Sequence, residues 1–157
     1  MSALPTPDLK FFADLSVEVA KPIEVGKTVH GTRRLISILG GSVQGDGWTA
    51  RVLPGGADFQ LIVNARMAEL DARYALETDA GDVIYVQNNA IRTASPEVMA
   101  KLIKGEVVSP DSVYFRCTPR FETASPALSW ISERLFIGTY CQAARIFSSS
   151  LPRNWPN

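Results

Sequence analysis

Short runs of alternating apolar and polar residues recur along most of this chain, with turn-forming residues between them. The clearest run is Met67 to Thr78. Read as a strand, it has one mainly apolar face and one charged face, because successive side chains of a strand point to opposite sides. The apolar face holds Leu70, Ala72, Tyr74 and Leu76, and the charged face holds Asp71, Arg73 and Glu77. The pattern predicts a long central strand.

The same pattern predicts a series of shorter strands. They cover residues 11–20, 32–38, 48–53, 59–63, 83–88, 112–118, 134–138 and 143–147, with a short piece at 42–44. Turn residues such as Gly45-Asp46-Gly47 and Pro54-Gly55-Gly56 separate them. Residues 95–104 differ, because their apolar positions recur at helical spacing. Ser95 is a favoured N-cap and Pro96 suits the first helical position, so one short helix is predicted there.

Roughly nine or ten short strands with turns between them are typical of an antiparallel all-β domain. At 157 residues the chain is most simply one domain, with loose termini at 1–8 and 151–157. A single-domain, calycin-like β-barrel with one short helix near 95–104 explains why both faces of several strands are patterned, since a small barrel can enclose one ligand. A two-sheet sandwich is the competing interpretation.

The charge balance excludes two classes of partner. Lys+Arg 16 against Asp+Glu 16 gives a net charge of zero, whereas nucleic-acid binders and polybasic membrane anchors need a basic excess. A net charge near zero leaves self-association unopposed, which allows a homo-oligomer, a dimer or higher. The sequence shows neither a signal peptide nor an apolar run of the ~20 residues that span a membrane. Two cysteines are too few for a disulfide framework, so we expect a reduced, cytoplasmic protein.

Motifs for the common cofactors are missing. The chain lacks a P-loop, a dinucleotide-binding glycine motif that opens a helix, and a nucleophile elbow. The single histidine, His30, cannot form a multi-histidine metal site and lies in a turn region. Cys117 and Cys141 have no histidine nearby in sequence to activate them, so Cys117 is expected to be a small buried residue. The sequence therefore predicts no metal and no cofactor.

Carboxylates and arginines beside aromatic residues are the chemistry that remains. The candidate catalytic acids or bases are Asp58, Glu77 and Glu122, because burial raises the pKa of a carboxyl group. The candidate ligand contacts are Arg73, Tyr74, Tyr114, Arg116, Phe121 and Phe59.

Each charged candidate also has a structural interpretation. Asp58 can bind the amides of its own turn, after glycines that allow the turn to aim it inward. The face that carries Arg73 and Glu77 can be a solvated outer surface, with Arg73 close enough to pair with Asp71. Arg116 can pair with Glu122 or Asp58 and simply hold the barrel together.

Five motifs occur in an order that resembles a bacterial and fungal family of proteins of unknown function, DUF3237 (UPF0311). They are Gly31-x-Arg33-Arg34, Gly40-Gly41, Leu53-Pro54-Gly55-Gly56-Ala57-Asp58-Phe59, Leu70-Asp71-Ala72-Arg73-Tyr74 with Glu77-Thr78, and Tyr114-Phe115-Arg116-x-x-Pro119-Arg120-Phe121-Glu122. The resemblance runs from about Leu9 to Gly138. It implies a compact β-barrel, often oligomeric, and it implies no established activity.

Three functions fit these observations. The first is a barrel that binds a small organic metabolite: a carboxylate, a lactone or an oxygenated ring. The second is an enzyme without metal or nucleotide (an isomerase, cyclase, hydratase or lactone-handling enzyme) that uses a buried carboxylate as acid or base. The third is a structural oligomer without a ligand. A pocket shared by Asp58, Arg73 and Arg116 would favour the first two.

Overall fold

The computed structural model describes residues 3–140 and 144–149 of the chain. Its strands all belong to one antiparallel sheet. The strands are β1 (Leu9–Val19), β2 (Ile23–Thr28), β3 (Gly31–Gly45), β4 (Thr49–Val52), β5 (Ala57–Asn64), β6 (Met67–Thr78), β7 (Val83–Ala94), β8 (Val113–Thr123), β9 (Phe136–Tyr140) and β10 (Ala144–Ser149).

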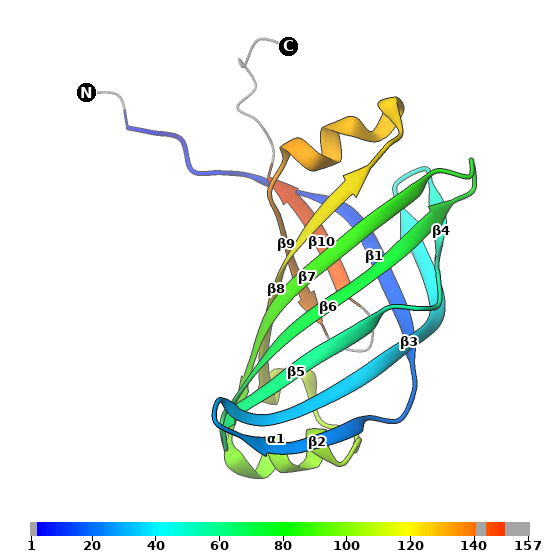
Figure 1. Ribbon diagram of the computed structural model, residues 1–157. Coiled ribbons are helices and arrows are strands. Elements are labelled where there is room, and N and C mark those ends of the chain that lie inside the picture. The colour runs from blue at the N-terminus through cyan, green and yellow to red at the C-terminus, as the bar shows by residue number, and fades with distance from the viewer. Residues whose placement is uncertain (1–2, 141–143, 150–157) are drawn as a thin grey trace.

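The sheet closes into a barrel because β1 pairs with β10 on one side and with β3 on the other. Around the ring the strands follow the order β1-β10-β9-β8-β7-β6-β4-β3, which makes a closed barrel of 8 strands (Figure 1). Two strands lie off this ring: β5 fills the space between β3 and β6 beyond β4, and β2 pairs with the first part of β3. The predicted β-barrel is therefore confirmed, and the sandwich is excluded.

A short helix lies at each end of the barrel (Figure 1). At one end is α1 (Pro96–Ile103), and at the other is the 3₁₀ helix η2 (Pro126–Glu133); a 3₁₀ turn, η1 (Pro110–Ser112), precedes β8. The predicted helix is confirmed, and the Ser95 hydroxyl accepts a hydrogen bond from the Val98 amide at 3.2 Å. We call the two halves of the barrel the α1 end and the η2 end. In the described part of the chain, no helix is long and apolar enough to cross a membrane.

The η2 end is filled by packed aromatic side chains. The ring of Phe12 is central, with centroids of four other rings within 6 Å: Phe136 at 4.8 Å, Trp48 at 5.2 Å, Phe121 at 5.4 Å and Trp130 at 5.8 Å. Aromatic pairs at these separations stabilise a core beyond the area that they bury. This end of the barrel therefore supplies much of the hydrophobic core and leaves little room for a ligand.

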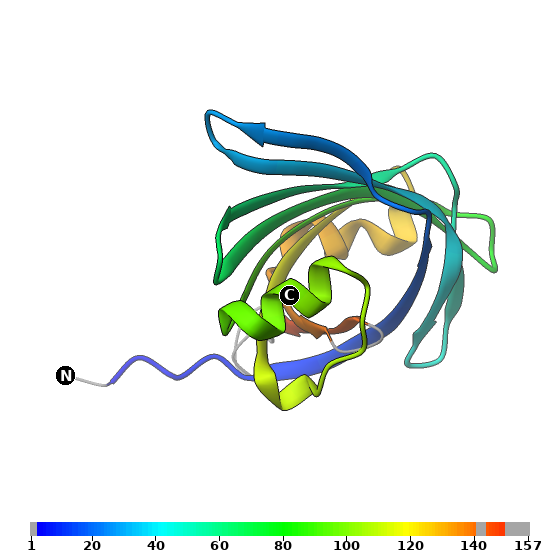
Figure 2. The same cartoon turned by 90° about the horizontal axis from the view of Figure 1, so that it is seen from below.

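The α1 end is different, because several side chains on its inner wall stay partly accessible to solvent. Ile36, Ile62, Ala72, Asn88 and Arg92 are only half-buried, although their strand positions point inward. Figure 2 shows α1 in front of this end of the barrel. The inner wall of the α1 end is thus where polar side chains and solvent meet inside the fold.

Candidate functional site

Cross-strand pairing brings polar residues together on the inner wall of the α1 end. Directly paired residues of antiparallel strands point to the same face of the sheet. One row joins Ile36, Asp58, Ala72 and Asn88 across β3, β5, β6 and β7; the next joins Arg34, Gln60, Leu70 and Ala90; the third joins Thr32, Ile62, Ala68 and Arg92. We call five of the polar residues in these rows (Arg34, Asp58, Gln60, Asn88 and Arg92) the interior cluster.

Asp58 points into this cluster because of the turn before it. A side chain at Gly56 would place its Cβ 2.3 Å from the carbonyl oxygen of Arg73, so only glycine allows β5 to approach β6 so closely. Gln60 Nε2 donates a hydrogen bond of 2.7 Å to Asp58 Oδ2, while Oδ1 is buried without a partner. Burial raises the pKa of Asp58; the Gln60 hydrogen bond and the positive charge of Arg92 oppose this rise.

Two arginines of the cluster act electrostatically on this carboxyl group. Arg34 is only 5% exposed, and its Nη1 donates a hydrogen bond of 3.2 Å to the carbonyl oxygen of Ile103 at the end of α1. Glu24 lies 3.6 Å from Arg34 Nε, which is close enough for an ion pair but too far for a hydrogen bond. Burial lowers the pKa of Arg92. The Nε–H groups of both arginines are buried and have no hydrogen-bond partner.

Asn88 completes the cluster and connects it to the neighbouring strand. Its side chain hydrogen-bonds to the thiol of Cys117, whose pKa is raised mainly by burial. Asn88 Oδ1 is buried without a partner. Tyr74 lies deeper, in the next row toward the η2 end; burial, first of all, and the nearby charge of Asp58 raise its pKa.

The cluster therefore combines two guanidinium groups, one carboxyl group and two amides, with four of their polar atoms unpartnered. A buried polar atom without a hydrogen bond costs about 1–3 kcal/mol, so native proteins keep few of them, and each one calls for an explanation such as a catalytic role or a bound molecule that completes the bonding. Among the residues that the structure describes, no group of three or more His, Cys, Asp or Glu side chains could hold a metal ion. Hydrogen bonding and charge are what this site offers.

Comparison with known proteins gives the family. The model of a family described as protein of unknown function, DUF3237, matches residues 7–145. The UPF0311 protein of Rhodopseudomonas palustris strain TIE-1 is 44% identical over 140 residues, which cover 89% of this chain and 92% of that protein. The chain belongs to the DUF3237 family.

Solved structures of similar proteins agree with the fold. A conserved protein of unknown function from Rhodopseudomonas palustris superposes with a TM-score of 0.88 at 39% identity, covering 94% of this chain and 100% of that one. A β-barrel-like protein from Acinetobacter baumannii gives a TM-score of 0.79 at 35% identity, covering 97% of this chain and 100% of that one. The barrel is therefore shared across these relatives.

In this DUF3237 protein, most of the residues singled out from the sequence do not share a site with Asp58. The charged face of β6 is the outer surface: Arg73 Nη2 lies 3.1 Å from Asp71 Oδ2, and Glu77 Oε1 lies 2.8 Å from Arg51 Nη2 on β4. Glu122 and Phe59 are also exposed on the outside of the barrel. The expected Arg73–Asp71 pair is confirmed, and it belongs to a solvated face.

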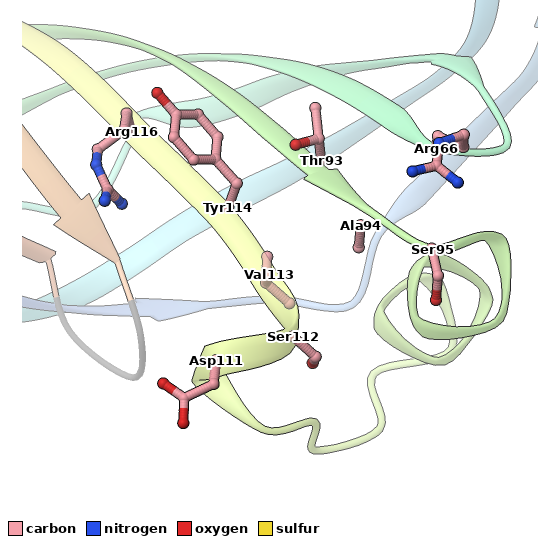
Figure 3. Close-up of a pocket in the computed structure, with 9 residues that line it drawn as sticks. All are labelled: Arg66, Thr93, Ala94, Ser95, Asp111, Ser112, Val113, Tyr114 and Arg116. Atoms are coloured by element: carbon pink, nitrogen blue, oxygen red, sulfur yellow. The ribbon is translucent and has the colours of Figure 1, made fainter.

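The remaining candidates divide between the core and a surface groove. Tyr74 and Phe121 are buried on the inner face, and Phe121 packs in the aromatic core of the η2 end. Tyr114 and Arg116 lie outside, where the Arg116 guanidinium stacks 4.9 Å from the centre of the Tyr114 ring. They line an open groove of about 450 Å³ with Arg66 and Ser95, shown in Figure 3. Arg73 and Arg116 therefore do not share a pocket with Asp58.

Four residues of the interior cluster were not among the candidates: Arg34, Gln60, Asn88 and Arg92. A signal for Arg34 and Arg92 does exist in the sequence, because each lies on the same face of its strand as apolar residues that point into the core. Arg34 alternates in step with Ile36 and Ile38, and Arg92 with Ala90 and Ala94. A charged residue on the apolar side of a strand is unusual, because a buried charge needs a partner.

Proposed function

We propose that this protein binds a small polar organic molecule at the interior cluster. The observation that carries the proposal is the set of four buried polar atoms in the cluster that make no hydrogen bond: Arg34 Nε, Asp58 Oδ1, Asn88 Oδ1 and Arg92 Nε. They lie in the half of the barrel whose inner wall solvent reaches. A molecule with matching donors and acceptors would satisfy them and gain from the low dielectric of the interior. The ligand would enter at the α1 end, since aromatic side chains fill the η2 end.

A second candidate function, an enzyme working by acid–base chemistry, is favoured by one observation on Asp58. Its Oδ1 has no partner, and burial raises the pKa of the carboxyl group toward the range in which a general base works. Arg34 and Arg92 would stabilise an enolate or a carboxylate next to it. The reaction would be one that needs neither metal nor nucleotide, such as isomerisation, cyclisation, hydration or lactone opening.

A purely structural role explains less of the molecule. It accounts for the outer ion pairs Arg51–Glu77, Asp71–Arg73 and Asp14–Arg145, which are exposed to solvent and contribute little to stability. It gives no reason for two arginines with unpartnered Nε–H groups inside the barrel, where apolar side chains of similar volume would stabilise the fold better.

A thermal-shift screen against small carboxylates, lactones, phenols and cyclic ketones tests the proposal. We expect a subset of compounds to raise the melting temperature of the wild-type protein, since a ligand at 100 times its Kd adds about 2.7 kcal/mol to the free energy of unfolding. Arg92→Met should remove this stabilisation. Arg116→Met, which changes an arginine of the outer groove, should keep it and serves as the matched control.

The opposite pattern would contradict the proposal. Stabilisation lost in Arg116→Met but kept in Arg92→Met would move the binding site to the outer groove of Figure 3. No stabilisation of the wild-type protein by any compound class would favour a structural role.

A further inference from the structure

We infer that the molecule bound at the interior cluster is an organic hydroxy acid, taken up as its monoanion. The inference rests on the proposed function and adds the chemical class of the ligand. It follows from the kinds of unpartnered atoms in the cluster: two are donors, the Nε–H groups of Arg34 and Arg92, and two are acceptors, Oδ1 of Asp58 and Oδ1 of Asn88.

The negative charge of the ligand follows from the charges inside the barrel. Arg34 and Arg92 are both close enough to Asp58 to influence its carboxyl group electrostatically, and they influence each other. Guanidinium groups stay protonated in proteins, so two positive charges face at most one negative charge. Glu24, the cross-strand partner of Arg34 on β2, lies 3.6 Å from Arg34 Nε, but its side chain is 59% exposed and solvent screens its charge. An anionic group of the ligand between the two arginines would balance their positive charge inside the barrel, where solvent screens charges least.

The hydroxyl group follows from the acceptors. A carboxylate offers only lone pairs, so it satisfies the two arginines and leaves Asn88 Oδ1 without a donor. Asn88 and Cys117 occupy adjacent rows of β7 and β8, which places the amide beside the thiol. A ligand O–H group beside the carboxylate would donate to Asn88 Oδ1. A hydroxy acid carries both groups a short distance apart.

Matched probes separate the two features of the ligand. Mandelate carries a carboxylate and a hydroxyl group; phenylacetate lacks the hydroxyl, and mandelamide lacks the charge. A second series, 3-hydroxybenzoate with benzoate and 3-hydroxybenzamide, varies the spacing of the two groups. We expect the hydroxy acid of at least one series to bind about tenfold or more tightly than either analogue, as measured by calorimetry on the wild-type protein, because each analogue leaves a buried group unpaired.

Variants assign the two preferences to residues. Asn88→Leu should bind the hydroxy acid and its dehydroxy analogue equally, and Arg92→Met should lose the preference for the acid over the amide. Arg116→Met should keep both preferences. Equal affinity of the wild-type protein for acid and amide, or for acid and dehydroxy acid, in both series would overturn the inference while leaving the binding proposal intact. Binding of no probe would overturn the inference, and the screen described above would then decide the binding proposal separately.

Discussion

Asp58→Asn should make this protein more stable at and above neutral pH, and the gain should fade as the pH falls toward 3.8, the ordinary pKa of the carboxyl group. Burial raises the pKa of Asp58 in the folded state. The folded protein therefore binds the proton more tightly than the unfolded chain does. The stability that this proton confers is complete below the unfolded pKa and is lost as the pH rises through the higher folded pKa. Asparagine does not titrate, so the variant does not lose stability as the pH rises.

Thermal unfolding of the two proteins across a pH series measures this effect. Asp46→Asn is the matched control, because Asp46 is exposed in the turn between β3 and β4, and this variant should follow the pH dependence of the wild-type protein. A constant difference between Asp58→Asn and wild type at every pH would show that Asp58 is not the titrating group. A loss of stability at neutral pH would show that its charge is well compensated in the fold.

Phe12→Ala should destabilise the protein by about 3–5 kcal/mol, the usual cost of truncating a large buried aromatic side chain. Phe12 is 8% exposed and packs against four other rings at the η2 end. Its loss would leave a cavity that the surrounding β-sheet is too rigid to fill. Chemical denaturation measures the change in the free energy of unfolding.

The neighbouring residue provides the control for this prediction. Phe11 is half-buried, and it contacts Phe147 at 6.4 Å and the guanidinium of Arg145 at 5.5 Å. Phe11→Ala should therefore cost clearly less than Phe12→Ala. Equal costs would show that the ring cluster around Phe12 adds no more stability than a half-buried ring beside it, which would contradict the stabilising role given to this aromatic core.

Much of the fold could be predicted from the sequence, because its strands carry strong local patterns. Met67–Thr78 was delimited correctly by alternation alone, and α1 by its Ser95 cap and Pro96. The errors arose at glycines and in weakly patterned segments. The predicted strand at 32–38 stops just before Gly40-Gly41, since paired glycines are typical of turns, yet β3 continues to Gly45. Gly41 adopts φ +140° and passes so close to the backbone of Ser16 on β1 that no side chain fits. Here glycine allows close packing of two strands instead of ending one.

Other segments were missed for lack of alternation. No strand is predicted between residues 20 and 32, where Pro22 and Gly26 interrupt the alternation, yet β2 spans Ile23–Thr28; β8 likewise continues through Pro119 to Thr123. Pro119 interrupts the alternation of apolar and polar residues, but pairing with β7 keeps β8 extended through this position. Cys141 and the segment 151–157, which was expected to be loose, fall outside the described residues.

The site was harder to predict than the fold. Asp58 is a candidate from the sequence because the glycine turn before it is a local signal. Its neighbours Arg34, Asn88 and Arg92 come from β3 and β7, and only the register between strands brings them beside it. The alternation of side chains along a strand shows which residues share a face, but it does not show which face points into the barrel. For this reason the charged face of β6 favours Arg73 and Glu77 as candidates, although it is the outer face, and the sequence alone does not single out Arg34 and Arg92 on the inner wall.

Arginine side-chain NMR tests the central claim most directly, because it observes the Nε–H groups themselves. The signals of Arg34 and Arg92 can be assigned with single Arg→Lys variants. On saturation with the compound that gives the largest thermal shift, both signals should move, since each Nε–H gains a hydrogen-bond acceptor. Those of Arg51 and Arg145, already bonded to Glu77 and Asp14, should stay in place. Movement confined to Arg66 and Arg116 of the outer groove would contradict binding at the interior cluster.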